Sequence, residues 1–548
     1  MSDSSHDFDF IVIGSGFGGS VTAHRLTEKG YRVAVMEMGR RWTPENLPST
    51  NWQIWRWFWR PRLALRGFFS MEYFKHVVIL HGCAVGGGSI TYANTMLVPQ
   101  NSVWDSGSWA GLADWKAEMP RHYDTAVRML GVDENRILGP ADHFLKQAAE
   151  AVGVGHTFYR TNVAVFEPPE GEAAGKEYPD PYFAGDGPAR CTCIACGGCM
   201  VGCRYHAKNS LDKNYLYLAE KRGARVFDET RVVDVVPLGA ADGSAGYEVR
   251  TVDSISLLRK HARRFTCRGV VFAASALGTM DLLFRLKLKG SLPALSDQIG
   301  NRVRTNAESL IGVRVPGSCE DFSKGIAIGS GIYLDDDTHI EVVRYPAGSD
   351  AMGPLATILT GGRPGHTRIL SWLGTLFGSL LLHPIRTARA LHPFGWARES
   401  VIFLCMQTLD RHINMRLRRR WFYPFKKILT SQGEKIPTFI PRANEFARRA
   451  AQLIGGTPMS MITEILFNVP GTAHILGGCP MAGSSAEGVV DHRNRVFGYK
   501  NMYICDGSVL AANLGVNPSL TICAVTERAM GFIPPAAETA WDDAAEKR

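Results

Sequence analysis

The beginning of the chain has the hydrophobic pattern of a strand–helix–strand unit. Phe8–Ile13 is a short apolar run that predicts a strand, and residues 20–29 read as a helix. Tyr31–Met36 is a second apolar run of strand length, and it ends at Glu37. Two strands joined by a helix in this way predict the start of an α/β fold with parallel strands.

Further along, three stretches interleave aromatic side chains with arginine. They read WQIWRWFWRPRLALRGFF at residues 52–69, ILSWLGTLFGSLLL at 369–382 and RLRRRWFYPFKK at 416–427. The middle run is too short to cross a bilayer, but apolar segments with Trp and Arg neighbours are typical of the membrane interface. We therefore predict attachment to a membrane surface, with anionic headgroups near the arginines. The alternative is that these aromatic side chains fill an interior or a contact between subunits.

Composition narrows the class of protein only moderately. The chain has 548 residues, 45% of them hydrophobic and 21% charged, which indicates a folded protein of two or three domains. Its net charge of +9 favours anionic surfaces, but no nucleic-acid recognition motif accompanies it. The N-terminus lacks the basic and apolar regions of a signal peptide. We therefore expect a cytoplasmic protein, peripheral on the inner face of the membrane.

A glycine-rich turn joins the first predicted strand to the first predicted helix. Gly14, Gly16 and Gly19 have the spacing G-x-G-x-x-G, and Glu37 ends the second strand. In a dinucleotide-binding βαβ unit such glycines allow a tight turn and a close approach of the pyrophosphate, which binds at the helix N-terminus. The carboxylate after the second strand accepts hydrogen bonds from ribose hydroxyls. These four residues predict a dinucleotide site, without deciding between FAD and NAD.

Motifs near both ends of the chain make the prediction more specific. They are VGGGSITYAN at residues 85–94, HILGGCPM at 474–481, DGS at 506–508 and GVNP at 515–518. With these motifs the chain resembles the glucose–methanol–choline (GMC) oxidoreductases, a family of FAD enzymes that oxidise alcohols. The string Gly515–Arg528 is most similar to the bacterial cholesterol oxidases of that family.

The resemblance implies roles for individual residues. His474 would act as the base for the hydroxyl proton, or orient the hydroxyl, and Asn517 would hydrogen-bond the same oxygen and face the flavin. Imidazole is the side chain best suited to such proton transfer at neutral pH. One departure from the family is Ser275, which stands where its members usually have glycine. Further FAD contacts are implied at Gly86, Gly87, Ser89, Asn94, Val233 and Asp506.

The resemblance also implies an architecture. We expect an α/β protein, with a Rossmann-like FAD-binding domain and an α+β substrate domain built on an antiparallel sheet. The FAD-binding domain would be discontinuous, over residues 1–115, 220–305 and 465–535. The other expected parts are a helical segment with a cysteine-rich loop at 116–219, the substrate domain at 306–464 and a polar tail at 536–548.

Five of the twelve cysteines lie between residues 191 and 203. Cys193, Cys196, Cys199 and Cys203 have the spacing of a bacterial iron–sulfur run, although no proline follows the last of them. The segment also resembles that of FAD-dependent sugar dehydrogenases, which pass electrons through a [3Fe–4S] cluster. We predict a [3Fe–4S] or [4Fe–4S] cluster on these four residues, with Cys196 deciding the type and Cys191 dispensable. A structural zinc site and unliganded thiols are the alternatives.

The leading functional hypothesis is FAD-dependent oxidation of a hydrophobic alcohol, for example a 3β-hydroxysterol. Hydride would pass to the flavin, and electrons would leave through the cluster to a quinone, a cytochrome or a ferredoxin-like acceptor. A dehydrogenase of a sugar, polyol or long-chain alcohol is the first alternative, and a non-catalytic redox protein is the second. Isomerisation of an oxidised sterol would need a carboxylate base, for which Glu341 and Glu399 are candidates that no motif separates.

Overall fold

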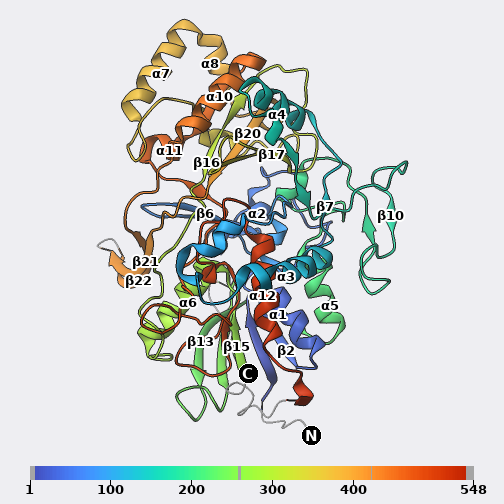
Figure 1. Cartoon of the computed structure of the whole chain (residues 1–548), viewed down its shortest axis with the longest axis vertical. Helices are drawn as coiled ribbons and strands as arrows, with labels where there is room; N and C mark the ends of the chain where they lie inside the picture. The colour runs from blue at the N-terminus through green and yellow to red at the C-terminus, as the bar shows by residue number, and fades with distance from the viewer. Residues whose placement is uncertain (1–5, 257–260, 421–422, 539–548) are drawn as a thin grey trace.

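Two seven-stranded sheets form the framework of the molecule, one in the lower half and one in the upper half of Figure 1. The figure shows the computed structural model, which describes residues 6–256, 261–420 and 423–538. An α/β fold that combines a Rossmann-like part with an antiparallel sheet is therefore confirmed.

The lower sheet assembles strands from the beginning, middle and end of the chain. Its order is β12-β2-β1-β15-β14-β13, and β25 pairs with β15. β12, β2, β1, β15 and β25 run parallel, whereas β13, β14 and β15 form an antiparallel edge. The strands are β1 (Phe8–Ile13), β2 (Val33–Met36), β12 (Arg225–Phe227), β13 (Thr230–Pro237), β14 (Tyr247–Asp253), β15 (Ala262–Phe272) and β25 (Met502–Ile504).

Helices cover the lower sheet because their apolar faces need partners. α1 packs against α5 and α12, and α12 also packs against α3. The helix predicted at residues 20–29 begins earlier, at Phe17, because the glycine turn passes directly into it. α3 begins where the Asp114 carboxylate accepts a hydrogen bond from Ala117 N, and it ends at Leu130, just before the left-handed Gly131. The helices are α1 (Phe17–Glu28), α3 (Trp115–Leu130), α5 (Tyr215–Lys221), α6 (Ser275–Lys289) and α12 (Ser519–Gly531).

The upper sheet is antiparallel throughout, in the order β19-β23-β16-β20-β18-β17-β8. α10 (Pro441–Ile454) and α4 (Pro140–Ala151) form one hydrophobic core with it. α4 falls in the range assigned above to a separate segment with the cysteine loop. The structure places it here because its buried Phe144 and Leu145 require an apolar surface. The strands are β8 (Tyr159–Arg160), β16 (Ser309–Arg314), β17 (Ile328–Tyr333), β18 (Thr338–Val343), β19 (Ala356–Ile358), β20 (Ser400–Gln407) and β23 (Thr457–Met461).

Smaller elements link and extend the two halves. β5 (Phe69–Tyr73), β6 (Val78–Gly82) and β24 (Gly471–Thr472) form a three-stranded sheet. Of the tail predicted at 536–548, Ala536–Glu538 forms a 3-10 turn, and residues 539–548 lie outside the described residues. The remaining elements are α2 (Ile54–Trp57), β3 (Trp59–Arg60), β4 (Leu65–Arg66), β7 (Asp133–Glu134), β9 (Asn162–Val163), β10 (Glu177–Tyr178), β11 (Arg190–Cys191), α7 (Ile369–Leu382), α8 (Pro384–Leu391), α9 (Trp396–Glu399), β21 (Asn414–Arg420), β22 (Tyr423–Gln432) and α11 (Ile462–Phe467).

Candidate active site

A cavity of about 960 Å³ extends from the lower sheet to the upper one. One end is lined by the turn between β1 and α1, by the end of β2 and by β13. The other end is lined by β16, β20 and β23 of the upper sheet. Ligands of α/β sheets bind at the carboxyl ends of parallel strands, where the first end of this cavity lies. The volume is at the upper end of the range for small-molecule sites.

The glycine turn has the geometry that a dinucleotide needs. Gly14 has φ +105°, and a Cβ there would lie 2.3 Å from the oxygen of Ala273. A Cβ on Gly19 would lie 2.1 Å from Gly14 O, so both positions require glycine for packing. Gly16 has open space instead, and it caps α1 without a side-chain hydrogen bond to the first-turn amides. The helix N-terminus is thereby available to a pyrophosphate, and the residues present fit FAD.

Glu37 lies at the end of β2, buried and on the cavity wall. Its carboxylate accepts hydrogen bonds from Ser15 N at 3.0 Å and from Gly39 N at 2.7 Å. Burial raises the pKa of this carboxyl, and the hydrogen bonds from Gly39 and Ser15 oppose that shift. Val233, on β13, lines the same end of the cavity. Both residues therefore lie where the nucleotide prediction needs them.

The second glycine loop, at residues 85–90, touches the first. A Cβ on Gly87 would lie 2.5 Å from Gly16 Cα, and Gly87 lines the cavity. Gly86, Ser89 and Asn94 do not line it. Ser89 shapes the loop instead, because its hydroxyl donates to Gly86 O and accepts from Leu211 N. Asn94 is buried between lining residues, and neither polar atom of its side chain has a hydrogen-bond partner in the protein.

Two further residues shape the cavity near the start of α6. Asp506 is buried on its wall and accepts hydrogen bonds from Thr279 Oγ1 at 2.5 Å and Ser508 N at 2.8 Å. Burial raises its pKa. Ser275 begins α6 with φ +67°, in the left-handed region. That backbone conformation favours glycine, which is the residue the resemblance predicts at this position.

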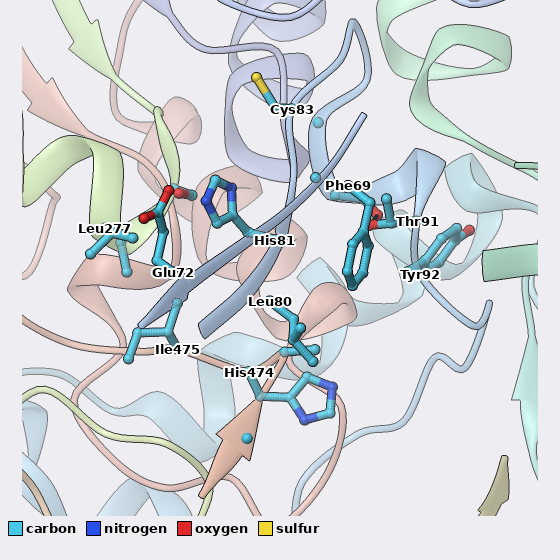
Figure 2. Close-up of a pocket in the computed structure, with 18 of the residues that line it drawn as sticks. Phe69, Glu72, Leu80, His81, Cys83, Thr91, Tyr92, Leu277, His474 and Ile475 are labelled. Atoms are coloured by element: carbon cyan, nitrogen blue, oxygen red, sulfur yellow. Dashed lines mark hydrogen bonds between the residues drawn. The ribbon is translucent and has the colours of Figure 1, made fainter. Parts of the chain in front are cut away.

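His474 and Asn517 both line the cavity. His474 follows β24, and its Nδ1 contacts Oε1 of Glu308. Asn517 lies just before α12, and its Nδ2 donates a hydrogen bond to Oε2 of Glu341 at 3.1 Å. Figure 2 shows the His474 ring together with Leu80 of β6, which lines the same cavity. The structure thus pairs each predicted catalytic residue with a buried carboxylate.

These four groups form one electrostatic cluster. Burial lowers the pKa of His474, but the adjacent Glu308 carboxylate and the charge of Glu341 outweigh this, and the net shift is upward. Burial raises the pKa of Glu341 to about 7. The protonation of Glu341 therefore changes near neutral pH, next to a histidine whose pKa is raised, which suits acid–base chemistry.

Sequence reasoning identified this cluster only in part. Glu308 was missed, because it belongs to no motif and reaches His474 only through the fold. Of the two carboxylates considered for isomerisation, Glu341 lies in the cluster. Glu399 does not line the cavity, and it forms an ion pair with Arg314 at 3.0 Å.

Cys193, Cys196, Cys199 and Cys203 line a second cavity, of about 20 Å³, and Cys191 does not. Burial raises the pKa of Cys199 to about 11, which favours its neutral thiol. Within residues 6–256, 261–420 and 423–538, no three His, Cys, Asp or Glu side chains are positioned to hold a metal ion. The cavity has room for roughly one water molecule. The iron–sulfur and zinc predictions therefore gain no support from this arrangement.

A buried lysine that follows the cysteine motif connects the cysteine loop to the second glycine loop. Lys208 Nζ donates hydrogen bonds to Ile90 O and to Cys199 O, both at 2.8 Å. Burial lowers its pKa to about 8. Met200, next to Cys199, lines the large cavity. The cysteine loop is therefore part of the wall of the candidate active site.

Comparison with known proteins identifies the family. Models described as GMC oxidoreductase match residues 189–298 and 406–526, and one described as an NAD(P)-binding Rossmann-like domain matches residues 12–44. A cholesterol oxidase of Acinetobacter baumannii is 61% identical over 535 residues, covering 97% of this chain and 96% of the relative. A cholesterol oxidase of Mycobacterium tuberculosis is 45% identical over 543 residues, covering 97% and 92%. The chain belongs to the GMC oxidoreductase family.

It is accordingly an enzyme, a flavin-dependent alcohol oxidoreductase. A more distant relative is a long-chain-alcohol oxidase of Arabidopsis thaliana, 22% identical and matching 94% of this chain and 65% of its own. Among solved structures, pyridoxine 4-oxidase from Mesorbium loti superposes with a TM-score of 0.60 at 14% identity, covering 95% of this chain and 98% of that one. This last likeness supports the fold alone.

Proposed function

We propose that the protein oxidises the 3β-hydroxyl group of a sterol. The observation that carries the proposal is the apolar end of the large cavity, which lies on the upper sheet and shares its lining with His474 and Asn517. A rigid, largely apolar substrate suits such a surface, whereas a sugar or polyol would leave its hydroxyl groups without partners there. The lining at this end includes Leu310, Ile402, Leu404, Met459 and Met461. The relatives named cholesterol oxidase support the same substrate.

FAD, when bound, supplies the acceptor for the hydride that leaves the carbinol carbon. His474 takes the hydroxyl proton on the ring nitrogen that Glu308 does not contact. The Glu308 carboxylate holds the ring in place and stabilises the imidazolium that results. Asn517 is oriented by Glu341 through its Nδ2, and its buried Oδ1 has no partner in the protein. That oxygen is therefore available to the substrate or to the cofactor.

Anaerobic mixing of the FAD-loaded enzyme with candidate substrates tests this function. Cholesterol in detergent should bleach the absorbance of the oxidised flavin much faster than glucose, a polyol or a long-chain alcohol. Failure of every sterol to reduce the flavin would refute the substrate assignment. Faster reduction by a sugar or polyol would favour the alternative class of dehydrogenase, and no reduction by any alcohol would favour a non-catalytic redox protein.

A second proposal concerns the route by which electrons leave. We propose that the cysteine loop holds an iron–sulfur cluster and that the acceptor is a quinone, a cytochrome or a ferredoxin-like protein. Its motivation is the spacing of the four cysteines in the sequence, since all four line one small cavity but no three of them are positioned to hold a metal ion among the described residues. The cavity would have to widen, because a cluster is larger than one water molecule.

Iron and sulfide analysis of protein purified without oxygen, with an EPR spectrum, tests the second proposal. Stoichiometric iron and sulfide would support it. If metal-free protein consumes dioxygen at full rate with a sterol, the iron–sulfur proposal is excluded, and the enzyme is an oxidase that passes electrons to dioxygen.

A further inference from the structure

The hairpin of α7 and α8, residues 369–391, exposes an unusually apolar surface. None of the fourteen residues of α7 is buried. Leu370, Phe377 and Leu381 are 85%, 68% and 83% exposed. The surface continues through Leu382 and Ile385, which are 72% and 70% exposed. In Figure 1 the two helices stand at the top of the molecule, above the upper sheet. A continuous apolar face of this kind indicates an interaction surface.

The polar side of α7 faces the protein, opposite to the usual orientation of a surface helix. The hydroxyls of Ser371 and Thr375 hydrogen-bond with the Thr360 hydroxyl at 2.7 Å and 3.0 Å. Trp372 Nε1 donates to Thr357 Oγ1 at 3.0 Å. These contacts fasten one stripe of the helix to β19 and the loop after it, and they leave the Leu and Phe side chains pointing outward. The hairpin is therefore held in position with its apolar face unpartnered.

The chain segment that carries the hairpin has charged residues of one sign only. Between Ala351 and Arg398 the chain has five arginines and no Asp or Glu. Arg368 is buried, 4.0 Å from Glu464, whereas Arg363, Arg386 and Arg389 are exposed. An apolar face with exposed arginines near it in the chain complements anionic lipid headgroups over an acyl layer. Within the described part of the chain, no helix is long and apolar enough to cross a membrane. α7 would measure about 21 Å, which suits a helix lying in the membrane surface.

The hairpin is attached beside the apolar end of the cavity. Both α7 and α8 contact β19, the edge strand of the upper sheet. Ala356 of β19 and its partner Met461 of β23 both line the cavity. A surface that docks through the hairpin would therefore lie next to this end of the active site.

We propose that the α7–α8 hairpin inserts its apolar face into the surface of a bilayer that contains anionic phospholipid. It holds the apolar end of the cavity at the membrane, where a lipid-soluble alcohol can enter directly. The entry of substrate rests on the proposed sterol oxidation, whereas membrane binding does not.

The structure separates this hairpin from the other two stretches predicted to meet a membrane. Residues 52–69 contribute Trp57, Phe68 and Phe69 to a buried core, although Trp52 and Trp55 stay exposed. The stretch 416–427 includes residues 421–422, which lie outside the described residues. The hairpin alone is therefore the subject of the test.

The test measures co-sedimentation with vesicles of phosphatidylcholine containing phosphatidylglycerol, using the FAD-loaded enzyme. The variant F377D/L381D should bind these vesicles at least about tenfold more weakly, because each change removes a large apolar side chain from the bilayer. The control L288D changes an exposed leucine of α6, far from the hairpin in sequence, and should bind like the unmodified enzyme. Equal binding of F377D/L381D and the unmodified enzyme would overturn the proposal.

Two further measurements separate membrane binding from catalysis and from dimer formation. Sterol oxidation by F377D/L381D should be unchanged in detergent and reduced when the sterol is supplied in vesicles. If the enzyme binds vesicles but oxidises no sterol in either form, the proposed function fails and the membrane anchor stands. If light scattering shows a dimer that F377D/L381D converts to a monomer, and vesicles do not bind, the face is an interface between two copies and the membrane proposal is wrong.

Discussion

The two ends of the large cavity are built on different principles. The nucleotide end consists mainly of backbone, in two glycine loops so close that a Cβ on Gly87 would meet Gly16. The apolar end, on the upper sheet, lies beside a cluster of side chains from four separate segments, namely Glu308, Glu341, His474 and Asn517. A backbone site depends on local conformation, whereas a side-chain cluster depends on how distant segments pack. The four predictions below test that difference, from the largest expected effect to the smallest.

Replacing His474 by Ala should nearly abolish sterol-driven flavin reduction. We expect a loss of about 10²–10⁴-fold, the usual contribution of a positioned base. Stopped-flow measurement of anaerobic flavin bleaching gives the rate. The FAD content should stay at one per chain, because the glycine turn is untouched. A rate within about tenfold of the unmodified enzyme would remove His474 from the role of base.

At the nucleotide end, Gly14→Ala and Gly16→Ala should behave differently. Gly14→Ala introduces a Cβ beside Ala273 O at positive φ, and should destabilise the protein by about 3 kcal/mol. Gly16→Ala meets no atom within 4 Å, so the free energy of unfolding of the apoprotein should change by less than about 0.5 kcal/mol. It should nevertheless bind FAD more weakly, because the methyl group faces the cavity. Denaturant unfolding and FAD titration check both, and equal stability of the two variants would contradict this view of the turn.

Replacing Glu308 by Gln should move the pH dependence of turnover. The Glu308 carboxylate raises the pKa of His474, so its neutral replacement lowers that pKa. The base works as neutral imidazole, so activity rises as pH increases through this pKa. In Glu308→Gln the rising limb should therefore appear at lower pH, with a reduced maximum because the imidazolium loses its partner. A profile of kcat against pH measures both effects, and an unchanged limb would show that Glu308 does not act on His474.

The smallest effect is expected at Ser275. Its φ of +67° costs a residue with a side chain roughly 1 kcal/mol relative to glycine. Ser275→Gly should therefore stabilise the FAD-loaded enzyme by about that amount in denaturant unfolding, with little change in activity. Ser275→Ala keeps the Cβ and serves as the control. An equal gain in the free energy of unfolding of Ser275→Ala would mean that the serine hydroxyl, and not the positive φ, destabilises the enzyme.

Local patterns predicted the first βαβ unit well, whereas the surroundings of other segments depend on distant packing. The strand predicted at Phe8–Ile13 agrees with β1, because an apolar run directly before a glycine turn can adopt few other buried conformations. α4 lies in the range expected to contain a helical segment and the cysteine loop, and the structure shows that its apolar face packs on the upper sheet. Ser89 lies in the second glycine loop and Asn94 follows that loop, but neither residue lines the cavity. The roles of the predicted site residues remain predictions, and the variants above test those of His474, Gly14 and Gly16.

The chain's own motifs were enough to specify the family and the glycine turn and to select His474 and Asn517 as candidates, because each depends on a few neighbouring residues. Only the tertiary structure could pair His474 with Glu308 and Asn517 with Glu341. The same holds for the exposed face of α7, because its apolar run alone is compatible with a buried helix. These contacts and exposures arise from packing between segments that are far apart in the sequence. The pattern of residue types along one segment does not show which other segments will pack against it.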